Sequence, residues 1–219
     1  MTSRTPSPTR RFTATATFLA ALVLATSACT SGQASPTAAP VPSASASASA
    51  SPVVSATATA PPSYKPADAK GKAQNVPVPV LPEAAKKKTK EGLEAFARYW
   101  FQLLSYGYET GDTTRLTELT SPSCRACEKA KAVIKGWHEG GRWIVGGRTS
   151  TPAVSTTFLV APDGNYQVAI QVSQSALSYF NPDGTLYRSD PKPDDTGNLM
   201  LSVYRNGSWF VNNIQPIVG

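Results

Sequence analysis

The segment from residue 30 to residue 80 most constrains what this chain can fold into. It consists mainly of Ala, Ser, Thr and Pro in near alternation, with nine prolines and a single aromatic residue, Tyr64. A segment with so few large apolar side chains cannot bury enough surface to offset the entropy lost on ordering. It is therefore predicted to be a disordered linker, and the folded domain is expected to begin near Pro82.

The first 28 residues have the order of an export signal. Three arginines and no acidic residue precede an apolar run over residues 18–25, and small residues then lead to Cys29. The run is shorter than the roughly 20 residues that a permanent membrane helix needs. Residues 1–28 are therefore predicted to be a cleaved signal peptide, and both the general and the twin-arginine export routes stay open.

Cys29 resembles the lipid-bearing cysteine of bacterial lipoproteins. Thr26 replaces the leucine usual in that motif, so ordinary signal-peptidase cleavage near Ala28 is an alternative. An unpaired cysteine at the cleavage point of an exported protein is explained if it carries lipid. We therefore expect a lipidated N-terminus and linker over residues 29–81. A single domain over residues 82–219 is then expected on the outer face of the cell membrane.

The net charge of +7 belongs to the N-terminal part of the chain. From residue 91 onward the sequence holds 11 basic and 12 acidic residues, which is close to neutral. Nucleic acid is therefore not expected as a partner, because proteins that bind it carry basic residues on the folded domain. One lysine cluster either attracts the domain to an anionic surface or is simply solvated. It consists of Lys86, Lys87, Lys88 and Lys90.

Apolar residues recur at steps of three and four between Leu93 and Leu104, which indicates an amphipathic helix. Gly111 can end this helix, Asp112 can cap the next one, and Pro122 suits the start of a third. The sequence thus predicts helices over residues 83–109, 113–119 and 121–139.

From residue 142 onward, apolar and polar residues alternate in short runs separated by turn signals, of which Asn206-Gly207 is the strongest. The predicted strand segments are residues 143–145, 154–161, 166–172, 186–187, 199–204 and 209–214. Helices followed by antiparallel strands predict an α+β domain, with the N-terminal helices packed on a curved antiparallel sheet.

This order of elements looks like the cone-like fold of the nuclear transport factor 2-like superfamily. More closely, Ala95–Trp100, Tyr106–Asp112 and Ser121–Cys127 resemble an uncharacterised actinobacterial lipoprotein family, the domain of unknown function DUF6318, over residues 82–217. The resemblance implies a fold and an envelope location but no activity. The superfamily contains isomerases, dehydratases and non-catalytic binding modules, so the fold alone does not define the function.

Cys124 and Cys127 form a Cys-x-x-Cys pair once Cys29 is assigned to lipid. In an oxidising compartment a local disulfide is expected. A redox pair at a helix start and a metal site are the alternatives, although the chain offers only His138 as a further zinc ligand of the Cys or His kind. We expect neither a metal nor a cofactor.

The sequence contains no recognisable catalytic constellation. His138 is expected to be a solvated residue at a helix end, and Asp112 is expected to cap a helix rather than to transfer protons with Tyr108. A solvated loop is expected to hold three further carboxylates, Asp190, Asp194 and Asp195.

The first helix carries more aromatic residues than one buried face can hold. Tyr99, Trp100, Tyr106 and Tyr108 occupy several of its faces, so part of this group is expected to form a ligand or partner surface. The leading hypothesis is a non-catalytic module that binds an envelope protein or an apolar ligand. The alternative is a cone-fold enzyme, an isomerase or dehydratase, that acts on a small apolar substrate.

Overall fold

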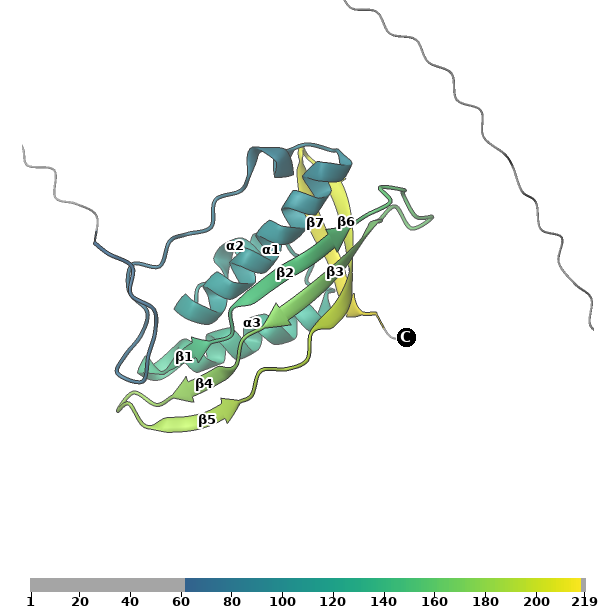
Figure 1. Ribbon diagram of the computed structural model, residues 1–219. Helices are drawn as coiled ribbons and strands as arrows, with labels where there is room; N and C mark the ends of the chain where they lie inside the picture. Colours follow the sequence, from purple (N-terminus) through teal and green to yellow (C-terminus); the bar gives the residue numbers. More distant parts are fainter. Residues whose placement is uncertain (1–61, 218–219) are drawn as a thin grey trace, which may run out of the picture. The chain divides into compact units, whose positions relative to one another are not determined.

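A computed structural model describes residues 62–217, so the predicted signal peptide and Cys29 lie outside the described residues. Within them the chain is an α+β domain, as predicted (Figure 1). The prediction of a single curved sheet is corrected, because the strands form two separate antiparallel sheets. None of the helices between residues 62 and 217 is long and apolar enough to span a bilayer.

The helical elements are the 3₁₀ helix η1 (Glu83–Lys86), α1 (Lys90–Thr110), α2 (Thr114–Glu118), α3 (Arg125–His138) and the 3₁₀ helix η2 (Glu139–Gly141). The strands are β1 (Trp143–Gly146), β2 (Thr149–Ser155), β3 (Tyr166–Gln174), β4 (Leu177–Phe180), β5 (Leu186–Asp190), β6 (Thr196–Arg205) and β7 (Ser208–Pro216).

Helix α1 begins later than the sequence predicts, because Thr89 caps it. The Thr89 Oγ1 accepts a hydrogen bond from the Gly92 N–H at 3.0 Å, which satisfies one of the free donors of the first turn. The preceding chain folds back so closely that a Cβ on Gly92 would lie 2.2 Å from the Lys87 carbonyl oxygen. The single helix predicted over residues 83–109 is therefore two helices joined by a close turn.

The boundaries of the other helices follow local hydrogen bonds. Gly111 ends α1 as predicted, with a φ of 83°, and the Asp112 Oδ1 accepts a hydrogen bond from the Thr114 N–H at 2.8 Å. Helix α3 begins later than predicted because Ser121 starts a turn instead, in which its carbonyl accepts a hydrogen bond from the Cys124 N–H at 3.0 Å.

The two sheets have the strand orders β2-β3-β6-β7 and β1-β4-β5. The hairpin predicted at Asn206-Gly207 joins β6 to β7, and both residues have positive φ, as the tight hairpin turn requires. Strand β4 is not predicted by the sequence, yet it pairs with both β1 and β5. Gly146 and Gly147, both with positive φ, lead the chain from one sheet to the other between β1 and β2.

The main core lies between the helices and one face of the four-stranded sheet (Figure 1). In β3, Val168 and Ile170 are buried whereas Gln167 and Ala169 are exposed, so the helices cover only one face of this sheet. The largest fully buried side chains of this core include Trp209, Phe96, Leu93, Leu116, Ile134, Ile170 and Met200. This interior fixes α1 against the sheet and so positions the groove described next.

Candidate functional site

Residues 62–81 form an extended segment, here called the strap, that lies beside α1 and the three-stranded sheet (Figure 1). Reciprocal backbone hydrogen bonds between Lys65 and Gln74, 3.0 and 2.9 Å long, close a loop within it. The Trp143 Nε1–H donates to the Asp68 carbonyl at 2.9 Å and ties this loop to β1. The sequence assigns this segment to the linker, whereas the structure places it on the domain.

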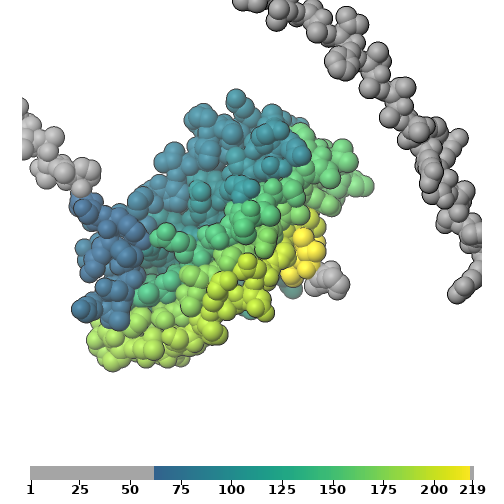
Figure 2. Space-filling view, in the orientation of Figure 1, coloured from purple at the N-terminus to yellow at the C-terminus, as the bar shows by residue number. Residues whose placement is uncertain are grey.

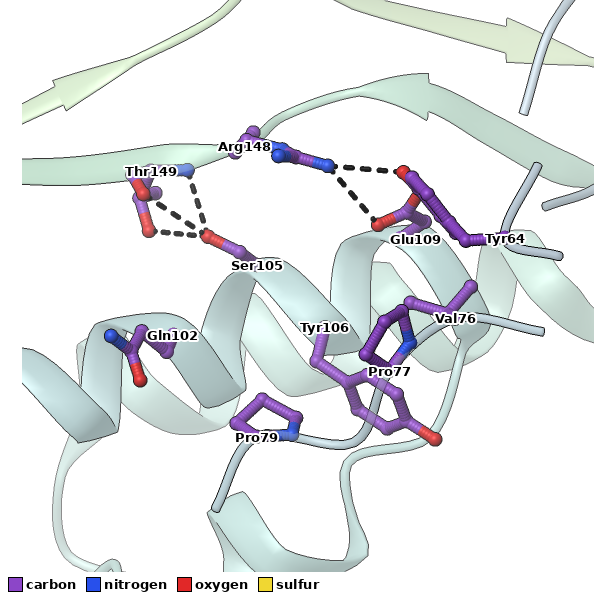
Figure 3. A pocket seen from close by; sticks show the side chains of 10 residues that line it. All are labelled: Tyr64, Val76, Pro77, Pro79, Gln102, Ser105, Tyr106, Glu109, Arg148 and Thr149. Atoms are coloured by element: carbon purple, nitrogen blue, oxygen red, sulfur yellow. Dashed lines mark hydrogen bonds and ion pairs between the residues drawn. The ribbon is translucent and has the colours of Figure 1, made fainter. Parts of the chain in front are cut away.

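A polar cluster of Tyr64, Glu109 and Arg148 joins the strap to α1 and to the turn between β1 and β2 (Figure 3). The Tyr64 hydroxyl donates a hydrogen bond to the Glu109 carboxylate. The Arg148 Nη2 donates to the Tyr64 oxygen at 3.0 Å and lies 3.7 Å from the Glu109 Oε2. The next residue, Thr149, donates its N–H to the Ser105 Oγ at 2.8 Å, which holds the backbone beside Arg148 against α1.

Two hollows lie on either side of this cluster and share Tyr64, Ser105, Glu109 and Arg148. The first has a volume of about 310 Å³, lies between the strap and α1 and is open to solvent; it is here called the strap groove (Figure 3). The second has a volume of about 250 Å³ and extends toward β1. The apolar wall of the strap groove consists of Val76, Pro77, Pro79 and Tyr106.

The charges of the cluster are unequally accessible. The Glu109 side chain is 17% exposed and the Arg148 side chain is 68% exposed. Partial burial raises the pKa of Tyr64, and the hydrogen bond to Glu109 raises it further, so the phenol stays a proton donor near neutral pH. Within residues 62–217 Nη2 is the only nitrogen of the Arg148 guanidinium with a partner, which leaves the Nε and Nη1 N–H groups free to bind an anion.

A third hollow, of about 190 Å³, lies between α1, α3 and the inner face of the four-stranded sheet. Its walls include Phe101, Leu104 and Ile214, and its polar groups include the side-chain amides of Gln174 and Asn198. The lining contains no Asp, Glu, His, Lys or Arg. This interior pocket can therefore take a small apolar group, but its lining supplies no carboxylate or imidazole for proton transfer.

The aromatic residues predicted to form one surface lie in different places. Tyr99 and Trp100 are buried in the main core, where the Trp100 Nε1–H donates to the Thr120 Oγ1 at 2.8 Å. Tyr106 lines the strap groove, and Tyr108 lines the interior pocket, to which the core residue Trp100 also contributes. The single aromatic surface is therefore corrected to one groove residue, one pocket residue and two core residues.

Cys124 and Cys127 form the predicted disulfide. Both are buried, with 0% and 2% of their surfaces exposed. A redox pair needs an accessible thiolate, so this geometry favours a structural bridge. Within the described part of the chain, no three side chains of the His, Cys, Asp and Glu types come together as a metal site would require.

His138 is not the solvated residue that its position near a helix end predicts. Its ring packs against Gly111, and its Nε2 lies 3.1 Å from the Tyr108 carbonyl oxygen. Burial lowers the pKa of His138. The residue therefore joins the end of α3 to the end of α1. Asp190 is the last residue of β5, not a loop residue as predicted, and pairs with Arg188; in the loop that follows, Asp195 pairs with Lys192.

Sequence reasoning did not identify Tyr64, Glu109 or Arg148 as site residues. Tyr64 lies 45 residues from Glu109 and 84 from Arg148 along the chain. Tyr64 was the one aromatic residue in a segment otherwise without large side chains, which is the signal that could have indicated a contact with the domain.

Together the fold and the groove define a small α+β domain with two antiparallel sheets and a ligand-sized hollow on its surface. The chain belongs to the family of unknown function DUF6318, whose model matches residues 62–215. The match includes the strap from its first described residue.

Two solved structures show limited similarity. The intermembrane space region of the chloroplast protein ARC6 has a TM-score of 0.40 and 10% identity, over 60% of this chain and 98% of that chain. An uncharacterised protein with a cystatin-like fold from Caulobacter vibrioides has a TM-score of 0.34 and 16% identity, over 58% of this chain and 89% of that chain. No curated protein matches the sequence.

Proposed function

We propose that this protein is a lipoprotein of the cell envelope whose domain is a non-catalytic binding module. Cys29 carries the lipid, and residues 30–61 connect it to the domain. The strap groove holds a ligand, or a segment of an envelope protein, that has an apolar body and an anionic end. The observation that carries the proposal is the combination of an apolar wall with an accessible arginine in one hollow.

The two ends of the groove differ in chemistry. Pro77 and Pro79 cannot donate backbone hydrogen bonds, and with Tyr106 they present an apolar surface that needs no polar partner. At the other end, Arg148 can bind a carboxylate or sulfonate through the N–H groups that Glu109 and Tyr64 do not use. An amphipathic ligand can satisfy both ends at once.

The fold proposed for this module is cone-like, with the interior pocket at the open end between the helices and the four-stranded sheet. The alternative function, a cone-fold isomerase or dehydratase, is favoured by one observation, which is that the Tyr64 hydroxyl donates to a groove carboxylate. The Glu109 carboxylate is, however, already engaged by the Tyr64 hydroxyl and by Arg148, so it has no free place for a substrate proton.

Binding of anilinonaphthalene sulfonate, a probe with an aromatic body and one sulfonate, tests the groove. Arg148→Leu is expected to weaken binding about tenfold, or about 1.4 kcal/mol, because a charge-assisted hydrogen bond is lost. Arg188→Leu is the matched control, since Arg188 is also exposed and also pairs with a carboxylate, but on β5. Equal affinities for the two variants would contradict the proposed site.

The lipid anchor is tested separately by cell fractionation. Cys29→Ala is expected to move the protein from the membrane fraction to the soluble fraction, because the thiol that a lipid needs is gone. The membranes are first washed with high salt, which removes protein held mainly by charge, so unchanged retention after the wash would contradict lipidation at Cys29.

A further inference from the structure

One end of the domain combines exposed apolar side chains with lysines. Leu159 and Val160, here called the apolar tip, lie in the loop between β2 and β3 and are 73% and 56% exposed. The lysine cluster over residues 86–90 lies at the same end, at the start of α1 (Figure 1). We propose that this end docks onto an anionic lipid bilayer, with the apolar tip entering the interface and the lysines facing the headgroups.

The apolar tip projects because the backbone before it is fixed in an unusual conformation. Phe158 has a φ of 58°, which a bulky side chain rarely adopts, and its N–H donates to the Thr156 Oγ1 at 3.0 Å. Its ring lies 4.9 Å from the Tyr166 ring, on the domain. Because Phe158 turns inward, the two residues that follow it point to solvent, and the green loop stands out from the body in Figure 2.

The lysine segment is held beside the apolar tip. The Trp209 Nε1–H donates to the Lys87 carbonyl at 3.0 Å, which fixes the backbone of the segment to the end of the sheet. The Lys88 Nζ lies 6.0 Å from the centre of the Tyr166 ring, and Tyr166 pairs with Val160 across a β-bridge. Charge and apolar surface therefore meet on one side of the molecule.

Most of the lysine charge is available to a partner. Within residues 62–217 Lys86 pairs with Glu83, whereas Lys87, Lys88 and Lys90 form no salt bridge. Of the nearby carboxylates, Glu94 accepts a hydrogen bond from the Thr156 N–H and Asp163 accepts one from the Asn165 N–H, and both keep their negative charge. Glu91, in the first turn of α1, is the remaining acidic side chain among the lysines.

This combination fits a membrane surface better than a purely polar polymer. Interfacial binding grows with the apolar area that enters the interface and with attraction to anionic lipid. Each lysine near an anionic bilayer improves partitioning by about fivefold. A polar wall polymer would offer the apolar tip no apolar contact. An anionic bilayer can bind both the apolar tip and the lysine cluster.

Co-sedimentation with vesicles tests this surface, independently of the strap groove. The full chain with Cys29→Ala is the background for every variant, so that the N-terminal segment contributes equally to each. Vesicles of phosphatidylcholine alone are compared with vesicles that also contain phosphatidylglycerol. We expect binding to the mixed vesicles that weakens with salt, and a loss of about tenfold for both Leu159→Asp/Val160→Asp and Lys87→Glu/Lys88→Glu.

The matched control is Leu186→Asp/Tyr187→Asp on β5, where the two side chains are 55% and 62% exposed. The control is expected to bind the mixed vesicles as the background protein does. Three results would each overturn the proposal: no binding to the mixed vesicles, unchanged binding by both tip and lysine variants, or an equal loss in the control. All six substituted residues are exposed, so each variant is expected to fold as the background protein does. Circular dichroism verifies this for each variant.

Discussion

Gly111 occupies a position where both backbone and space exclude a side chain. Its φ is 83°, and a Cβ there would lie 2.6 Å from the Cβ and Cγ of His138. Gly111→Ala is expected to lower the free energy of unfolding by about 2 kcal/mol, because it combines left-handed strain with displacement of His138. Chemical denaturation measures this difference.

Gly136 is the matched control, because it lies inside α3 and a Cβ on it would meet nothing within 4 Å. Gly136→Ala is expected to raise the free energy of unfolding by about 0.5–1 kcal/mol through its better helix propensity. Equal effects of the two substitutions would show that the contact between Gly111 and His138 is not as tight as described.

His138 makes stability depend on pH. Burial lowers its pKa, so the unfolded chain binds a proton more readily than the folded protein. The stability contributed by the neutral imidazole is therefore complete above the ordinary pKa of about 6.5 and is lost as the pH falls through the folded pKa. The free energy of unfolding should decrease between about pH 7.5 and about pH 5, and it should decrease less in His138→Gln. The same decrease in both proteins would contradict this account.

At the scale of elements, the sequence predicts what local chemistry determines. The turn at Asn206-Gly207 and the end of α1 at Gly111 depend on residues that favour positive φ, and both are confirmed. Strand β4 and the strap depend on partners that are distant along the chain, and neither was predicted. The helix break before α1 was missed because the apolar pattern begins only at Leu93 and does not define the start of the helix, which the cap at Thr89 sets.

The same difference between local contacts and contacts distant along the chain explains which site residues the sequence could predict. Cys124 and Cys127 are three residues apart, and their pairing is a local inference that the disulfide bears out. The cluster at the strap groove joins Tyr64, Glu109 and Arg148 from three elements, and only the fold brings them together. Of the four aromatic residues predicted to form a surface, Tyr106 alone lines this groove.

The strap is expected to stabilise the domain as well as to line the groove. A chain that begins at residue 82 loses the hydrogen bond from Trp143 to Asp68 and the packing of Leu81 on the main core. We expect it to be less stable by about 2 kcal/mol than a chain that begins at residue 62, from roughly equal contributions of hydrogen bonding and burial. Equal denaturation midpoints would show that the strap contributes only to the groove.

At the scale of the whole molecule, the domain has two separate surfaces: the strap groove, proposed to take an amphipathic ligand, and the end with the apolar tip, proposed to face a bilayer. Arg148 is the residue on which the first depends, and Glu109 competes with the ligand for it. Removing the Glu109 carboxylate should therefore improve binding of the ligand to the strap groove.

The dissociation constant of anilinonaphthalene sulfonate for the Glu109→Gln variant tests this prediction most directly. The variant should bind the probe about threefold more tightly than the unmodified protein, because the Glu109 carboxylate, which competes for Arg148 by up to about 1 kcal/mol, is gone. Weaker or unchanged binding by Glu109→Gln would contradict the assignment of the strap groove as an anion-binding site.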